Sequence, residues 1–169
     1  MRLLPAALAT AALSAVAAPA LAADLTVTIE VPRLSVAAYH KPYVAVWIET
    51  PDQTAVRTLA VWYEQVKPDN EGLNYLKDLR TWWRKGGRAM RMPADGVSGA
   101  TRAPGRQTIT IPAARMAGVA AGQYSLVVEA AREQGGRETV RIPFRWGAAN
   151  TGRTAGTTEL GTVTVSVSR

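Results

Sequence analysis

Apolar and polar residues alternate along several short stretches of this chain, a two-residue period typical of strands with one buried face. The clearest stretch is residues 25–31, LTVTIEV, in which every second residue is apolar. Strands of this kind are also predicted at residues 43–50, 55–64, 106–111, 123–131, 137–145 and 157–168. The second and third strands are separated by Pro51-Asp52-Gln53, which predicts a hairpin.

The period changes between Leu73 and Lys85, where apolar residues recur at intervals of three and four. This spacing predicts a short amphipathic helix that ends at Gly86 and Gly87. Seven strands with short turns and one short helical insertion predict an all-β fold, an immunoglobulin-like antiparallel β-sandwich. A small barrel is the alternative. Strands and helices do not alternate along the chain, so a Rossmann-type nucleotide site is not expected.

The first 22 residues have the composition of an export signal. Arg2 precedes an alanine-rich apolar run, and Ala20-Leu21-Ala22 offers the small residues that a signal peptidase accepts. We predict a signal peptide over residues 1–22, cleaved after Ala22, which leaves residues 23–169 as one β-sandwich domain in the periplasm. An uncleaved anchor is the alternative, but the run is too short to hold a bilayer firmly. No transmembrane segment is expected in the mature chain.

The 169 residues contain no cysteine and one histidine, His40. This composition excludes disulfides, thiolate metal sites and cysteine nucleophiles, and it disfavours multi-histidine zinc centres and serine–histidine–aspartate triads. His40, Met90, Met92 and Met116 could suggest copper, but they are scattered without a local motif, so no metal site is predicted. No pairing of base and nucleophile is visible, so an independent enzyme is not the favoured class.

Positive charge is concentrated in one part of the chain, whose net charge is +7. Residues 77–106 contain only two acids, Asp78 and Asp95, but eight basic residues: Lys77, Arg80, Arg84, Lys85, Arg88, Arg91, Arg102 and Arg106. This basic segment indicates a surface for an anionic ligand, partner or lipid surface, and a solvated helix face is the alternative. Nucleic acid is not expected, because the chain has an export signal and no recognisable binding motif.

Aromatic residues gather in the first half of the mature chain, at Tyr39, Tyr43, Trp47, Trp62, Tyr63, Trp82 and Trp83. They would either form core or line a binding face on which a flavin ring could stack. Tyr43 and Trp47 are the best candidates for exposure, because Val44, Val46 and Ile48 take the opposite face of their strand.

Residues 95–101, DGVSGAT, form the segment with the most distinctive chemistry. Two glycines and the lack of bulky side chains after Val97 make its backbone accessible. The segment ends in the hydroxyl of Thr101, followed by Arg102. A threonine hydroxyl is a weak nucleophile alone, so another enzyme would have to activate it. A tight turn in which Ser98 and Thr101 bond their own backbone is the alternative.

This segment resembles the D-x-x-S-G-A-T acceptor motif of flavinylated extracytoplasmic electron-transfer proteins. These include the FMN-carrying subunits of the sodium-translocating NADH:quinone reductase and of Rnf-type complexes. In them a FAD:protein FMN transferase attaches FMN to the last threonine by a phosphoester bond, although their motif lies in a different, α+β domain. The resemblance implies covalent FMN on Thr101, with a cofactor-binding site that also includes Asp95, Ser98, Gly99, Ala100 and Arg102.

The mature chain also resembles a family of predicted periplasmic proteins, domain of unknown function 2271, in residues 39–47, 57–63, 78–84, 98–101 and 128–133. That family tends to occur alongside flavin transferases and PepSY-type inner-membrane reductases. The resemblance implies a periplasmic flavoprotein electron carrier that works with such a reductase. A non-redox accessory module, which contacts a membrane partner through a basic, aromatic face, is the alternative.

Overall fold

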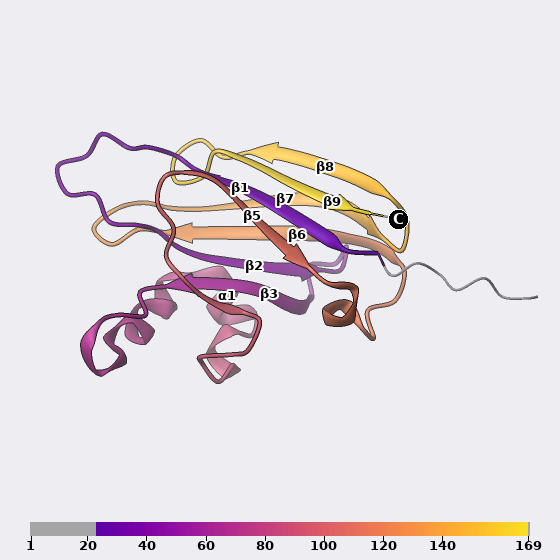
Figure 1. Cartoon of the computed structure of the whole chain (residues 1–169), viewed down its shortest axis with the longest axis horizontal. Coiled ribbons are helices and arrows are strands. Elements are labelled where there is room, and N and C mark those ends of the chain that lie inside the picture. Colours follow the sequence, from indigo (N-terminus) through magenta and orange to yellow (C-terminus); the bar gives the residue numbers. More distant parts are fainter. Residues whose placement is uncertain (1–22, 169) are drawn as a thin grey trace, which may run out of the picture.

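The computed structural model describes residues 23–168 as two stacked β-sheets with helical segments against one of them (Figure 1). The all-β sandwich expected from the sequence is confirmed, and the strands form two separate sheets rather than a closed barrel. The expected signal peptide, residues 1–22, lies outside the described residues. Within residues 23–168, no helix has the length and apolar character needed to cross a membrane.

The four-stranded sheet has the order β5-β1-β9-β8, and all its neighbours are antiparallel. Its strands are β1 (Leu25–Val31), β5 (Gly105–Ile111), β8 (Asn150–Ala155) and β9 (Thr162–Val167). The sequence pattern did not predict β8, because NTGRTA has no apolar face. Gly152 lets this strand approach the other sheet closely, since a Cβ there would lie 2.7 Å from the Cγ2 of Ile142.

The five-stranded sheet has the order β4-β3-β2-β6-β7. Its strands are β2 (Tyr43–Glu49), β3 (Ala55–Tyr63), β4 (Ser98–Ala100), β6 (Gly122–Ala131) and β7 (Arg137–Trp146). The predicted hairpin of β2 and β3 is confirmed. Strand β4 pairs parallel to β3 and occupies the edge of this sheet. With β4 and β8, the described residues form two more strands than the sequence predicted.

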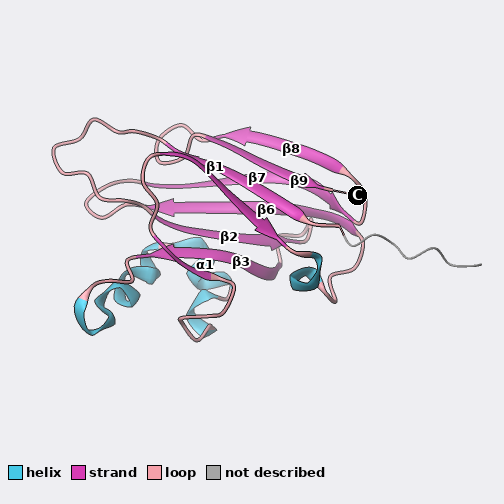
Figure 2. Ribbon diagram, viewed as in Figure 1, coloured by secondary structure: helices cyan, strands magenta, loops and turns pink. Residues whose placement is uncertain are grey.

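The helical segments between β3 and β4 are less regular than the single predicted helix (Figure 2). They comprise the 3₁₀ segment η1 (Pro68–Asp78), the helix α1 (Arg80–Lys85) and the 3₁₀ turn η2 (Gly87–Ala89). Leu79 separates η1 from α1 because its backbone, with φ −75° and ψ 69°, is not helical. A further 3₁₀ turn, η3 (Ala113–Met116), follows β5. We call residues 68–89 the helical layer.

The five-stranded sheet is apolar on both faces. One face joins the four-stranded sheet in the main core, which contains Val44, Val46, Trp62, Leu126 and Val128. The other face forms a second buried cluster with the helical layer, which contributes Leu76, Leu79 and Trp82. The protein therefore has three layers, and the helical layer provides the cover for the outer face of this sheet.

Two buried carboxylates fasten the helical layer to that face. Glu129 accepts hydrogen bonds from the backbone N–H groups of Thr81 (3.1 Å) and Trp82 (2.8 Å), and it pairs with Arg137 at 2.9 Å. Glu49 accepts a hydrogen bond from the Trp47 indole and pairs with Lys85 at 2.8 Å. Both glutamates are fully buried, so removing one of their partners would leave a costly unpaired charge.

A third carboxylate orders the loop between β8 and β9. Glu138 accepts hydrogen bonds from the backbone N–H groups of four consecutive residues, 157–160, at 2.6–3.0 Å. Burial by itself raises the pKa of the Glu138 carboxyl, but the backbone N–H groups of Thr157, Leu160 and Thr158 outweigh this effect and lower the pKa to about 2.

Glu138→Gln should therefore weaken the fold in a pH-dependent way. The folded pKa lies below the unfolded value of 4.5, so the carboxylate stabilises the fold above pH 4.5 and this contribution is lost as the pH falls toward 2. We expect the variant to lose about 2 kcal/mol of unfolding free energy at pH 7 and little at pH 2. Denaturant melts across this range measure it, and equal losses at both pH values would contradict the prediction.

Candidate functional site

The DGVSGAT segment folds as a turn followed by an edge strand. The turn closes where the N–H groups of Val97 (3.1 Å) and Ser98 (2.9 Å) donate to the carbonyl of Ala94. Ser98, Gly99 and Ala100 then form β4, in register with Val61, Trp62 and Tyr63 of β3. The sequence predicted no strand here. The strand forms because β4 supplies backbone partners to the otherwise unpaired outer edge of β3.

The hydroxyl of Ser98 is used inside the turn. Its Oγ accepts a hydrogen bond from the N–H of Ala94 at 2.9 Å and lies 4.0 Å from the sulfur of Met92. The alternative reading of the motif, in which Ser98 bonds its own local backbone, is thus correct for this residue. Ser98 has a structural part in building the turn.

Gly99 and Arg102 both lie against the indole of Trp62. A Cβ on Gly99 would stand 3.1 Å from Cδ1 of Trp62, a distance that few side chains occupy without displacing a neighbour. The guanidinium carbon of Arg102 lies 5.5 Å from the centre of the Trp62 ring, in a cation–π arrangement. The absence of a side chain at Gly99 therefore allows β4 and Arg102 to cover Trp62, which is 4% exposed.

Thr101 follows β4 directly and is held by its backbone only. Its N–H donates to the carbonyl of Tyr63 at 3.3 Å. Among residues 23–168, no group forms a hydrogen bond with its hydroxyl, and the residue is partly exposed. Asp95 is exposed at the start of the turn. The structure thus places the six predicted site residues in one continuous turn and strand, in which Thr101 offers an unengaged hydroxyl.

An open pocket lies at the end of β3, and Thr101 is not among the residues that line it. Tyr63, whose carbonyl binds the Thr101 amide, is one of its walls. Glu64, Gln65, Asn70, Leu73 and Pro93 form the rest. Tyr63 is buried, so the pocket offers a ligand mainly the amide and carboxylate groups of its other walls.

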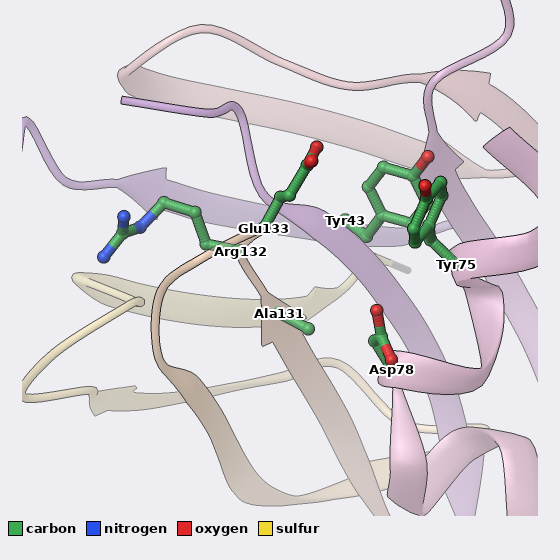
Figure 3. A pocket seen from close by; sticks show the side chains of 6 residues that line it. All are labelled: Tyr43, Tyr75, Asp78, Ala131, Arg132 and Glu133. Carbon is green, nitrogen blue, oxygen red and sulfur yellow. The ribbon is translucent and has the colours of Figure 1, made fainter. Parts of the chain in front are cut away.

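A second, much smaller hollow lies between the helical layer and the end of β6 (Figure 3). Tyr43 and Tyr75 lie together on one side of it, and Asp78 lies below them in the view, across from Ala131. Burial, with the nearby carboxylates of Glu64 and Glu133, raises the pKa of Tyr43 to about 12, although a backbone hydrogen bond opposes them. The Tyr43 hydroxyl donates to the carbonyl of Gly72 at 3.1 Å.

The charged groups around this second hollow are largely paired within the protein. Arg132 points away from the tyrosines and makes two hydrogen bonds to Glu159, at 3.0 and 3.1 Å. Glu133 lies 3.7 Å from His40 and 3.8 Å from Lys67. The sequence indicated none of these pairs, because their members come from separate turns. These pairs join the β6–β7 turn to the β8–β9 loop and to the segments that contain His40 and Lys67.

The family model of predicted periplasmic proteins known as DUF2271 matches residues 24–162. The chain belongs to this family. The family resemblance noted from the sequence and the expected periplasmic location are confirmed at this level. No curated protein and no solved structure matches the chain.

The aromatic residues of this DUF2271 protein are mostly core. Trp47 is 1% exposed, so the expectation that it lies on an open face is wrong. The alternation of β2 was assigned correctly, but the helical layer covers the second face and Trp47 packs in its cluster. Trp62 and Trp82 are buried too, while Tyr43 is partly exposed. The basic, aromatic face expected of a non-redox accessory module therefore lacks most of its aromatic residues.

The basic segment is exposed, with one exception. Lys85 is partly buried and bound to Glu49, so it has a structural part. The other seven residues are exposed: Lys77, Arg80, Arg84, Arg88, Arg91, Arg102 and Arg106. Arg102 is the member of this group that lies next to Thr101.

Gly99→Val should distort the site. A valine would press on the Trp62 ring, and we expect it to cost about 1–3 kcal/mol of unfolding free energy by overpacking. Tryptophan fluorescence and thermal melts measure the change. Ala100→Val, one residue along the same strand at an exposed position, is the matched control and should change stability by less than about 0.5 kcal/mol. Equal effects of the two variants would contradict the close packing at Gly99.

Proposed function

We propose that this DUF2271 protein is a periplasmic flavoprotein electron carrier with FMN attached covalently to Thr101. The modifying enzyme would be a FAD:protein FMN transferase, for which this protein is a substrate. The bound FMN would supply the ability to accept and donate electrons. The proposal rests on the resemblance of residues 95–101 to the acceptor motif and on the arrangement of those residues.

One observation carries the proposal: the two hydroxyls of the motif differ in their engagement. The hydroxyl of Ser98 is held by the Ala94 amide, while that of Thr101 has no hydrogen-bond partner among the described residues. An acceptor hydroxyl has to be free for an approaching enzyme, and its backbone has to hold it in place. Thr101 meets both conditions, because its own amide is anchored on Tyr63.

The chemistry needs only a hydroxyl from this protein. Oγ1 of Thr101 would attack the flavin-side phosphorus of FAD, form one P–O bond and displace AMP as the pyrophosphate bond breaks. The hydroxyl proton would pass to a base of the transferase, because no histidine or carboxylate of this chain pairs with Thr101 among the described residues. The product would be a phosphoester of Thr101 with FMN.

The residues around Thr101 fit a phosphoester of FMN. Arg102 is exposed and adjacent, so its guanidinium could neutralise the phosphate. The open pocket beside Tyr63 offers amide and carboxylate groups that could form hydrogen bonds with the flavin. The exposed basic segment would favour approach of the anionic FAD. We further propose a PepSY-type inner-membrane reductase as the electron-transfer partner, on the strength of the family resemblance.

Thr101→Ala should abolish covalent labelling. The protein is co-expressed with an active FAD:protein FMN transferase and ample FAD, and its intact mass is measured. We expect wild-type protein to gain the mass of one FMN with loss of water, and the variant to gain none, because the acceptor oxygen is gone. The melting temperature of the variant should stay close to that of wild type, since its hydroxyl makes no internal bond.

Ser98→Ala is the matched control. It removes the other hydroxyl of the motif and the bond to the Ala94 amide, so it should lose about 1 kcal/mol of stability and still be labelled on Thr101. Wild-type protein that gains no FMN mass, and shows no flavin fluorescence on a denaturing gel, would refute the flavoprotein and favour the non-redox accessory module.

Reversing the charge of Arg84 and Arg88 together, with Arg84→Glu and Arg88→Glu, should slow labelling severalfold at low salt. Both side chains are exposed, so the expected effect is on electrostatic steering and should vanish at high salt. Arg145→Glu with Arg153→Glu makes the same change of net charge at other exposed positions and should leave the rate near that of wild type. A large fall in melting temperature with an unchanged labelling rate would assign Arg84 and Arg88 a structural part instead.

A further inference from the structure

The backbone of β4 pairs with β3 along one edge, and its other edge has no neighbouring strand. Val61 donates to the carbonyl of Val97 at 2.8 Å, and Thr101 donates to that of Tyr63 at 3.3 Å. In a parallel ladder with this register, alternate residues bond the neighbouring strand, so the residues at 97, 99 and 101 face β3. The backbone groups of Ser98 and Ala100 face the other way, toward the open edge of the sheet.

Most of that open edge is unoccupied. The N–H of Ser98 is taken by the Ala94 carbonyl within the turn. Among residues 23–168, the carbonyl of Ser98 and both the N–H and the carbonyl of Ala100 have no hydrogen-bond partner. Ala100 is exposed and small, so no side chain of its own covers these groups. An exposed strand edge of this kind is a template for an added strand.

The side chains of the motif make contacts within the protein. The Ser98 hydroxyl closes the turn, Gly99 makes room for Trp62, and Arg102 lies over the same ring. These contacts leave little of Ser98 and Gly99 for an enzyme to recognise. The free backbone groups of Ala100, one residue before the acceptor hydroxyl, remain available to a partner.

We infer that the flavin transferase recognises this protein by adding an extended segment of its own to the free edge of β4, with paired backbone hydrogen bonds to Ala100. The inference rests on the proposed function and specifies how that partner binds. Strand addition obtains its affinity from main-chain hydrogen bonds and so places few demands on side chains. With β3 on one side and the enzyme strand on the other, the backbone at Thr101 is fixed, and its hydroxyl is held where FAD can be presented.

Ala100→Pro tests the inference. Proline removes only the N–H that faces the open edge, because Ala100 does not bond β3, and edge strands tolerate proline at such positions. The experiment measures the initial rate of FMN attachment with purified protein, transferase and FAD. We expect the rate to fall about tenfold or more, as for the loss of a hydrogen bond in the productive complex. Ala100→Ser keeps the N–H, so its labelling rate should exceed that of Ala100→Pro, and equal losses in the two variants would overturn the inference.

Amide hydrogen exchange provides a second measurement that does not depend on how Ala100→Pro folds. The Thr101→Ala protein cannot be labelled, so its complex with transferase and FAD can be followed without turnover. We expect exchange at the Ala100 amide to slow on addition of the transferase, while amides of β8, an edge strand of the other sheet, remain unchanged. Unchanged exchange at Ala100 would overturn the inference.

The outcomes separate the inference from the proposed function. Wild-type protein that is never labelled overturns the proposed function, and the inference falls with it. Wild-type protein that is labelled at the same rate as a folded Ala100→Pro variant overturns the strand addition alone. Labelling that is insensitive to Ala100→Pro but falls steeply with salt would show that the transferase docks on the basic segment instead.

Discussion

The five-stranded sheet buries apolar side chains on both faces, and its outer face stays dry only because the chain between β3 and β4 folds back over it. Hydrophobic contact supplies most of this cover. The buried carboxylates of Glu49 and Glu129 fix the position of the helical layer on the sheet, since each binds a particular group of that layer. With the layer fixed in this position, the chain leaves it beside the outer edge of β3, where β4 completes the sheet and Thr101 becomes presented at a defined place.

The sequence predicted the fold class because the strands that form the main core alternate cleanly, as in β1. It missed β4 and β8, which contain glycine, since neither has an apolar face that would produce a two-residue period. Their positions depend on contacts with distant strands, in particular the partnership of β4 with β3 and the close packing at Gly152. The two-residue period also gave the wrong environment for Trp47. Alternation identifies the two faces of a strand but does not show which other elements cover them.

The candidate site shows a similar division. Residues 95–102 could be singled out from the sequence because their composition and the family resemblance are local features. The different parts played by Ser98, Gly99 and Thr101 could not be predicted, since they depend on the Ala94 amide, the Trp62 ring and the Tyr63 carbonyl. Likewise, the buried ion pair of Arg132 with Glu159 joins residues 27 positions apart. The local sequence around one of these residues does not predict its pairing with the other.

The parallel pairing of β3 with β4 also has a consequence for the order of folding. Unlike a hairpin, this pair is joined by the whole helical layer, so its closure has to overcome the entropy of a long intervening loop. Contacts of this separation in sequence form late unless the intervening chain is already ordered. The strand that precedes Thr101 therefore exists only in a chain whose helical layer has docked. A newly made or misfolded chain would contain residues 95–101 without the turn and strand that they form in the folded protein. The acceptor geometry would therefore be present only in chains that have completed folding.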